Sequence, residues 1–174
     1  MIVASGLGLG PWDVFHQGLS RQVGVSLGWV VIAVGLAVLL LWIPLRQRPG
    51  LGTISNAIVI GLVIDATLTL LSQPASMSGR AGVLVAGVVI NGVATGLYIG
   101  AGLGPGPRDG LMTGLAARGH SIRVVRTAIE LTVLVIGWIL GGTVGVGTIL
   151  YALSIGPLAH FFLPRLAVSA PRTR

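Results

Sequence analysis

The chain has 174 residues, of which 53% are hydrophobic and only 9% are charged, and its mean hydropathy is +0.96. Because so few polar side chains cannot cover the surface of a water-soluble globular protein, the composition indicates an integral membrane protein. The chain has no cysteine, which excludes disulfides and thiolate sites, and all of its 11 basic residues are arginines, which we assign to membrane topology and not to nucleic-acid binding.

The chain opens with a glycine-rich stretch, GLGLGPWD at residues 6–13, followed by a short amphipathic segment at 13–22. Crossing about 30 Å of hydrocarbon takes about 20 helical residues, so this segment is too short to span. We expect an interfacial or re-entrant half-helix, whose backbone needs protein or water partners at membrane depth. Two apolar spans are then predicted at 27–45 and 53–72, with the turn RPGLGT between them.

The second part of the chain repeats this order. It contains a span, the stretch GLGPGPRD, a short amphipathic segment and two further spans, at residues 81–101, 102–109, 107–118, 122–141 and 148–164. Six of the eight positions in the two glycine stretches are identical, and Trp138 follows Trp42 at the same offset of 96 residues. A duplication in so apolar a chain predicts a transporter-like repeat, with any site between the halves.

We predict one membrane domain over residues 1–174, with repeat 1 at 1–75, repeat 2 at 80–165 and a basic cytoplasmic tail at 166–174. The first helix of repeat 1 is expected to be incomplete, which leaves five spans. An odd number of spans per repeat makes the halves run in opposite directions. The predicted fold is an all-α polytopic transmembrane bundle of two inverted three-helix repeats; a parallel repeat, in which the short segments count as spans, is the alternative.

Arginine placement agrees with the inverted arrangement. If Arg46 and Arg48 are cytoplasmic, only Arg21 and Arg80 of the 11 arginines fall outside, so the positive-inside rule is met almost throughout. The C-terminus is then cytoplasmic. Residues 1–10 lack the basic region of a cleavable signal peptide, so we expect insertion through the spans themselves.

Four segments carry a resemblance to a known family: GLGLGPWDVFHQGLS at 6–20, RPGLGT at 48–53, GLYIGAGLGPGPRDGLMTGL at 96–115 and GGTVGVGT at 141–148. They resemble the YczE/YyaS/YitT family of bacterial integral membrane proteins. The resemblance covers essentially the whole chain. It implies a six-span protein of the bacterial plasma membrane, with no catalytic residues to carry over, and the sequence departs from it in the incomplete first span.

The glycine stretches are the first candidate site. Glycines followed by proline and aspartate leave backbone N–H groups and the positive dipole end open at a helix start, where anions can bind. This interpretation predicts binding of a small, anionic solute at Gly8, Gly10, Asp13, Gly104, Gly106, Arg108 and Asp109. In the structural interpretation, Asp13 and Asp109 only cap their helices and the glycines permit close packing.

Ionisable residues inside spans are the second candidate, because a carboxylate at membrane depth is costly unless it is paired, protonated or hydrated. Asp65, Glu130 and His160 are therefore candidate coupling groups. Glu130 follows Arg126 by one helical turn, which makes an ion pair available. Asp65 and His160 are repeat partners, and a proton-linked pair is one hypothesis; contact of both with interfacial water is the other.

Two other sets of residues are expected at the membrane interface. His16 and His120 lie in the short amphipathic segments, and the four tryptophans fall near predicted span ends. No second ligand is suitably spaced from either histidine, so we expect no metal site.

The chain has no sequence motif of an enzyme. A faint likeness to the signature of membrane CDP-alcohol phosphotransferases around Asp109 has the wrong spacing, and Walker, HExxH and Ser-His-Asp patterns are absent from the sequence. We therefore expect no enzymatic activity and no cofactor. The sequence favours a secondary transporter or permease with its solute at the repeat interface, with a non-transporting accessory or regulatory protein as the alternative. Small glycine-rich helix faces suit a homodimer in the bilayer.

Overall fold

A computed structural model describes residues 1–166, and within these residues all regular structure is helical. The elements are α1 (Ile2–Ser5), α2 (Pro11–Val23), α3 (Leu27–Leu45), α4 (Leu51–Leu70), α5 (Met77–Gly100), α6 (Pro107–Ala116), α7 (Ile122–Ile139) and α8 (Val146–Leu166). The predicted basic tail lies outside the described residues from position 167 onward.

Four helices, α3, α4, α5 and α8, are long and apolar enough to cross a membrane. They match the spans predicted at 27–45, 53–72, 81–101 and 148–164. Helix α7 forms where the remaining span was predicted, but its 18 residues include Arg123, Arg126 and Glu130. Because charged side chains weaken an apolar span, its role as a fifth span stays a prediction.

Helices α2 and α6 have 13 and 10 residues, which confirms two short helices after the glycine stretches. Both start in the same way. Gly10 and Gly106 are extended, with φ −63° and ψ 156° and φ −61° and ψ 160°, and a proline with its pre-set φ follows as the first helical residue. The sequence Gly-Pro therefore determines where each short helix begins.

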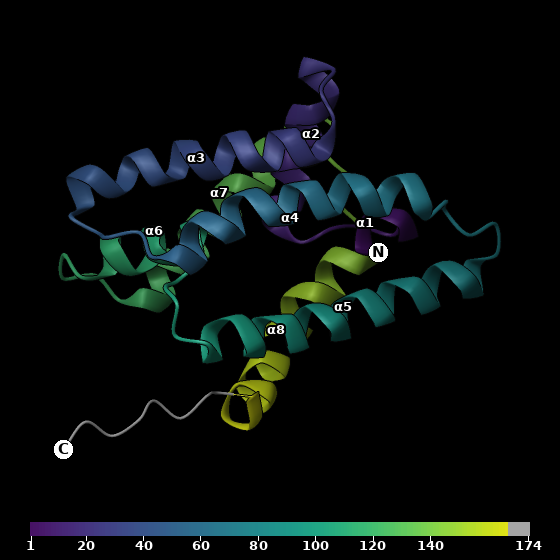
Figure 1. Cartoon of the computed structure of the whole chain (residues 1–174). Helices are drawn as coiled ribbons and strands as arrows, with labels where there is room; N and C mark the ends of the chain where they lie inside the picture. Colours follow the sequence, from purple (N-terminus) through teal and green to yellow (C-terminus); the bar gives the residue numbers. More distant parts are fainter. Residues whose placement is uncertain (167–174) are drawn as a thin grey trace.

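Each short helix packs on a long helix from the other part of the chain. Helix α2 lies along α7, while α6 lies against α3. The remaining extensive contacts join α3 to α4 and α5 to α8, and Figure 1 shows α3 beside α4 in the upper part of the view and α5 crossing α8 in the lower part. The centre of the molecule is thus built where α2 and α6 meet their long partners.

Close packing at the centre depends on glycine. A side chain at Gly110 on α6 would overlap the ring of Trp42, and one at Gly137 on α7 would overlap the backbone of Phe15 on α2. Trp42 is only 1% exposed and its indole N–H donates to the carbonyl oxygen of Pro107 at 3.1 Å. The interface prediction is therefore wrong for Trp42, and also for Trp12, which is 8% exposed.

Candidate functional site

The two glycine loops follow the same backbone path. Gly6 and Gly102 have φ of 64° and 67°, and Gly8 and Gly104 have φ of 117° and 110°. Residues other than glycine rarely adopt such angles. A side chain at Gly8 would also come within 2.7 Å of the backbone nitrogen of Gly145.

Each loop is hydrogen-bonded to a turn from the other part of the chain. The Gly147 N–H donates to the Leu7 carbonyl at 2.8 Å, and the Gly52 N–H donates to the Leu103 carbonyl at 3.0 Å. We call these the first-loop contact and the second-loop contact. They place the starts of α2 and α6 in equivalent settings.

A charged cluster lies where α2 and α6 approach each other, and we call Trp12, Asp13, His16 and Arg108 the central cluster. The Arg108 Nη2 atom is 3.8 Å from Asp13 Oδ1 and 3.4 Å from His16 Nδ1, and the guanidinium lies over the Trp12 ring, 5.1 Å from its centroid. The side chain of Asp13 is 27% exposed and that of His16 is 1% exposed, so the interface prediction is wrong for His16 as well.

The cluster combines an ion pair with a neutral imidazole. Burial lowers the pKa of His16 and the charge of Arg108 lowers it further, against the opposing effect of Asp13. Burial alone raises the pKa of Asp13, but the His16 interaction and the Arg108 charge outweigh it and lower that pKa below its usual value.

The cluster also contains an unpaired donor. The buried indole N–H of Trp12 has no hydrogen-bond partner within residues 1–166. Burying an unpaired donor costs roughly 1–3 kcal/mol, so such groups are rare and often belong to sites that receive a polar ligand or water.

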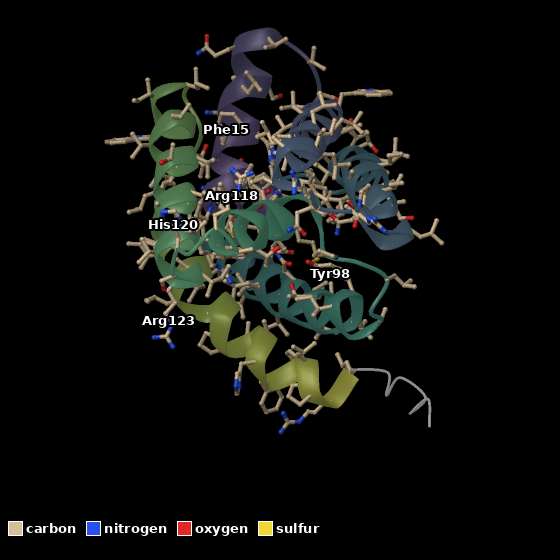
Figure 2. All side chains as sticks on the ribbon, turned by 90° about the vertical axis from the view of Figure 1, so that its left-hand side faces the viewer. Phe15, Tyr98, Arg118, His120 and Arg123 are labelled. Carbon is tan, nitrogen blue, oxygen red and sulfur yellow. The ribbon has the colours of Figure 1, made fainter. Side chains whose placement is uncertain are left out.

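Asp109, the counterpart of Asp13, has different surroundings. It accepts a hydrogen bond from the Tyr98 hydroxyl of α5, whose oxygen in turn accepts from the Gly106 N–H at 3.3 Å. Figure 2 looks at this end of the molecule and shows Tyr98 there. An open pocket of about 430 Å³ adjoins the carboxylate. Its lining residues are Tyr98, Ile99, Gly102, Gly104, Pro105 and Asp109.

The predicted substrate residues therefore fall into two groups. Asp13 and Arg108 meet in the central cluster, whereas Gly104 and Asp109 line the open pocket. Gly8 lies against the turn at Gly145, and the other two glycines precede the short helices. All seven residues thus belong to the two loops and helix starts.

The two carboxylates have side-chain partners from other helices, so neither interpretation of them made from the sequence describes the structure fully. The helix caps are Gly10 and Gly106, while Asp13 and Asp109 lie in the first turns. A carboxylate in the first turn already compensates the positive dipole end. This geometry weighs against an anion at either helix start.

The coupling candidates lie apart from this region and from one another. Asp65 on α4 accepts hydrogen bonds from the Gly28 N–H at 2.7 Å and from the Ser26 hydroxyl, so it pairs with two donors at the start of α3. Glu130 pairs with Arg126 at 2.9 Å, which confirms the predicted ion pair. His160 is exposed on α8, and the structure does not bring it together with Asp65.

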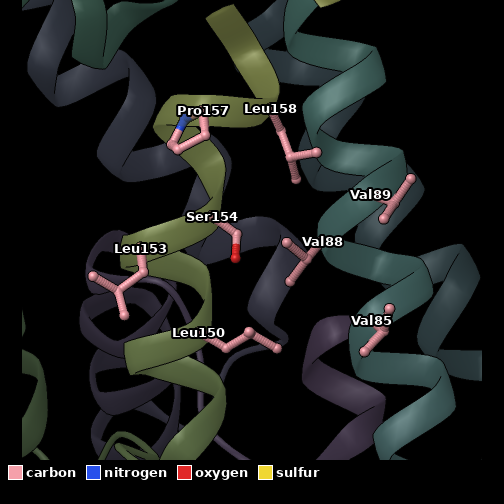
Figure 3. Close-up of a pocket in the computed structure, with 8 residues that line it drawn as sticks. All are labelled: Val85, Val88, Val89, Leu150, Leu153, Ser154, Pro157 and Leu158. Atoms are coloured by element: carbon pink, nitrogen blue, oxygen red, sulfur yellow. The ribbon is translucent and has the colours of Figure 1, made fainter. Parts of the chain in front are cut away.

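A second cavity of about 390 Å³ lies between α5 and α8 (Figure 3). The Ser154 hydroxyl is the one polar side-chain group among its lining residues. They are Val85, Val88, Val89, Leu150, Leu153, Ser154, Pro157 and Leu158. This lining suits hydrocarbon rather than a charged solute.

Sequence reasoning missed three residues of the site, Trp12, His16 and Tyr98. His16 follows Asp13 by three residues, a helical spacing that places both on one face and could have indicated the cluster. Tyr98 lies 11 residues before Asp109, across the loop between α5 and α6, and has no local signal.

Comparison with known proteins assigns the family. The profile of DUF6198, a family of unknown function, matches residues 1–164. The chain belongs to this family.

Relatives of this DUF6198 protein agree with the predicted resemblance. It is 45% identical over 168 residues to an uncharacterized protein of Haemophilus influenzae, covering 96% of this chain and 77% of the relative. It is 37% identical over 166 residues to the uncharacterized membrane protein YczE of Bacillus subtilis, covering 94% and 77%, and 29% identical over 171 residues to YyaS of the same organism, covering 94% and 84%. No solved structure matches the chain.

These relatives confirm the predicted resemblance to the YczE and YyaS proteins. With the four long apolar helices, they make the DUF6198 protein an integral membrane protein with several spans.

Proposed function

We propose that this DUF6198 protein is a secondary transporter of the bacterial plasma membrane that carries a small solute between its two halves. The observation that carries the proposal is the central cluster, an ion pair with a buried imidazole at the meeting point of two short helices. Ionisable groups inside membrane proteins mark solute and ion pathways, and short helices that start at loops form the sites of many transporters.

The proposal includes two inverted repeats. The matching backbone of the glycine loops, the two equivalent loop contacts and the crossed packing of α2 on α7 and α6 on α3 support it. With Arg46 and Arg48 inside, the positive-inside rule assigns the first-loop contact to the outer half of the molecule, the second-loop contact to the inner half and the C-terminus to the cytoplasmic side.

In this arrangement the two loop contacts act as gates. The first-loop contact is reinforced by additional ties between the end of α2 and the turn after α7. Thr143 N–H donates to Gln17 Oε1 at 2.7 Å, Gln22 donates to the Leu140 carbonyl at 3.1 Å, and Arg21 reaches Thr143. The first-loop contact, which is the outer gate, is therefore closed in this conformation.

The second-loop contact has fewer ties and lies beside the open pocket. The Thr53 hydroxyl donates to the Pro105 carbonyl at 2.7 Å, and Arg118 donates to the Pro44 carbonyl at 2.6 Å. The pocket that contains Asp109 adjoins this contact. Rearrangement of the second-loop contact, which is the inner gate, would connect this pocket to the central cluster.

Cysteine labelling tests the topology. Val25 and Ser121 are exposed, lie 96 residues apart and follow α2 and α6, so Val25→Cys and Ser121→Cys provide matched single thiols in this cysteine-free chain. We expect a membrane-impermeant maleimide to label position 25 in intact cells and position 121 only in inverted vesicles. Labelling of both from one face would overturn the inverted arrangement.

Uptake into proteoliposomes tests transport. Radiolabelled choline, acetate, glycine and glycerol represent the four charge classes of small solutes. We expect uptake of one class above that of protein-free vesicles, and a large loss of this uptake in Arg108→Gln. If no class is taken up, the accessory function replaces the transporter.

A further inference from the structure

We propose that the pocket beside the second glycine loop binds a small organic ammonium cation, with Asp109 as its counter-ion and the ring of Tyr98 as one wall. The inference rests on the proposed function, since it names the solute class of the same site.

The charge of the pocket favours a cation. Asp109 uses one oxygen to accept from Tyr98, and no arginine or histidine of the described chain forms an ion pair with it. Its neighbour Arg108 is directed to Asp13 and His16 instead. A carboxylate held in position without a cationic partner attracts a positive group and repels an anion.

The central cluster shows this recognition already in place. There, the cationic group of Arg108 lies beside the Asp13 carboxylate and over the Trp12 ring. In the second half, Asp109 occupies the equivalent helix position and Tyr98 supplies the aromatic ring, but the pocket beside them is open. The first carboxylate is thus paired with a cation of the chain itself, and the second is available to a cation from outside.

The size and walls of the pocket select an organic cation over a metal ion. Its volume of about 430 Å³ is that of a small-molecule site, and the side chains of Ile99 and Pro105 supply apolar walls. Alkylated ammonium groups bind to aromatic faces in this way. Hard metal ions need several oxygen ligands, and no group of three or more potential metal-binding side chains is found in residues 1–166.

Tyr98 is a positioning residue for the carboxylate. The Gly106 N–H donates to the Tyr98 oxygen, and the Tyr98 hydroxyl donates to Asp109. This chain links the backbone at the start of α6 to the carboxylate and holds the latter beside the pocket. Tyr98→Phe should therefore weaken cation binding while leaving the aromatic wall intact.

Thermal unfolding of the purified full chain in detergent tests the ammonium class. The probes are choline chloride, sodium acetate and 3,3-dimethylbutan-1-ol, the uncharged compound of the same shape as choline, all at equal ionic strength. We expect choline alone to raise the melting temperature. Equal stabilisation by the uncharged compound, stabilisation by acetate, or no effect of choline would overturn the proposal.

Variants locate the binding. Asp109→Asn should weaken choline binding about tenfold or more, because it removes the charge that faces the cation. Since that variant can fail to fold, Ile99→Trp offers a second test: Ile99 is 44% exposed and lines the pocket, which the larger side chain fills. Leu97→Trp, 51% exposed on the same helix but outside the lining, is the matched control. Undiminished choline binding in Ile99→Trp would place the cation elsewhere.

Binding in detergent separates this inference from the transport proposal. Choline binding without uptake of any solute class counts against transport and leaves the pocket assigned. Uptake of acetate or glycerol without choline binding overturns the ammonium class and leaves transport standing.

Discussion

The two glycine loops share a backbone but not a chemistry. Both have closely similar positive φ angles and both bond to a turn from the other half, yet Asp13 is paired with Arg108 while Asp109 borders an open pocket. The shared part depends on glycine and on main-chain hydrogen bonds, which few substitutions can imitate. The side chains around the loops are free to differ, so the same duplicated backbone holds one carboxylate that is paired with an arginine and one that borders an open pocket.

The largest expected effect comes from forcing a short helix off its long partner. In Gly110→Ala the new methyl group overlaps the Trp42 ring, and we expect a loss of about 3 kcal/mol of stability or failure to fold. Gly156→Ala in α8, where nothing lies within 4 Å, should be neutral or slightly stabilising. Thermal unfolding in detergent compares the two, and equal stability would contradict the packing of α6 on α3.

The next largest expected effect comes from removing Arg108 from the central cluster. Arg108→Gln leaves the Asp13 carboxylate without its cation, and we expect a loss of about 2 kcal/mol, below that of a fully buried pair because both side chains are partly exposed. Arg123→Gln, at an exposed position near the start of α7, should change stability by less than about 0.5 kcal/mol. Similar values for the two variants in the same unfolding assay would show that the Arg108–Asp13 pair adds no stability.

The pH dependence of stability sharpens the same comparison. The pKa of His16 is lowered in the folded chain, so protonation favours the unfolded state and stability falls as the pH drops below the ordinary value of 6.5. The lowered pKa of Asp13 has the same sign at more acidic pH, because its contribution is lost as the carboxylate becomes protonated. We expect His16→Gln to reduce the loss of melting temperature between pH 7 and pH 5. An unchanged loss of melting temperature in His16→Gln would show that His16 does not contribute to the pH dependence of stability.

The smallest effect distinguishes the two loop contacts. Thr53 and Thr148 accept equivalent bonds from Gly50 and Gly145 at 3.1 and 3.2 Å, but Thr53 also donates to Pro105. Thr53→Val should therefore cost about 1 kcal/mol more than Thr148→Val. A larger cost for Thr148→Val in urea unfolding would reverse the order.

Local features of the site were predicted well. Gly-Pro pairs predict the starts of α2 and α6, and the spacing of Arg126 and Glu130 predicts their ion pair. Asp65 shows the limit of such reasoning. Its partners, Ser26 and Gly28, are 39 and 37 residues away, so no helical spacing could reveal that it accepts hydrogen bonds at the start of α3.

The sequence by itself determined the membrane class, the duplicated glycine loops and the positions of the helices, because hydropathy, glycine and proline act within a few residues. Only the tertiary structure decided that α2 lies on α7 and α6 on α3, and thereby that Arg108 meets Asp13 while Asp109 keeps an open pocket. Asp13 and Asp109 stand in nearly the same sequence context, GPWD and GPRD. Their difference arises because the fold brings Arg108 from a distant part of the chain to Asp13, while Asp109 accepts from Tyr98.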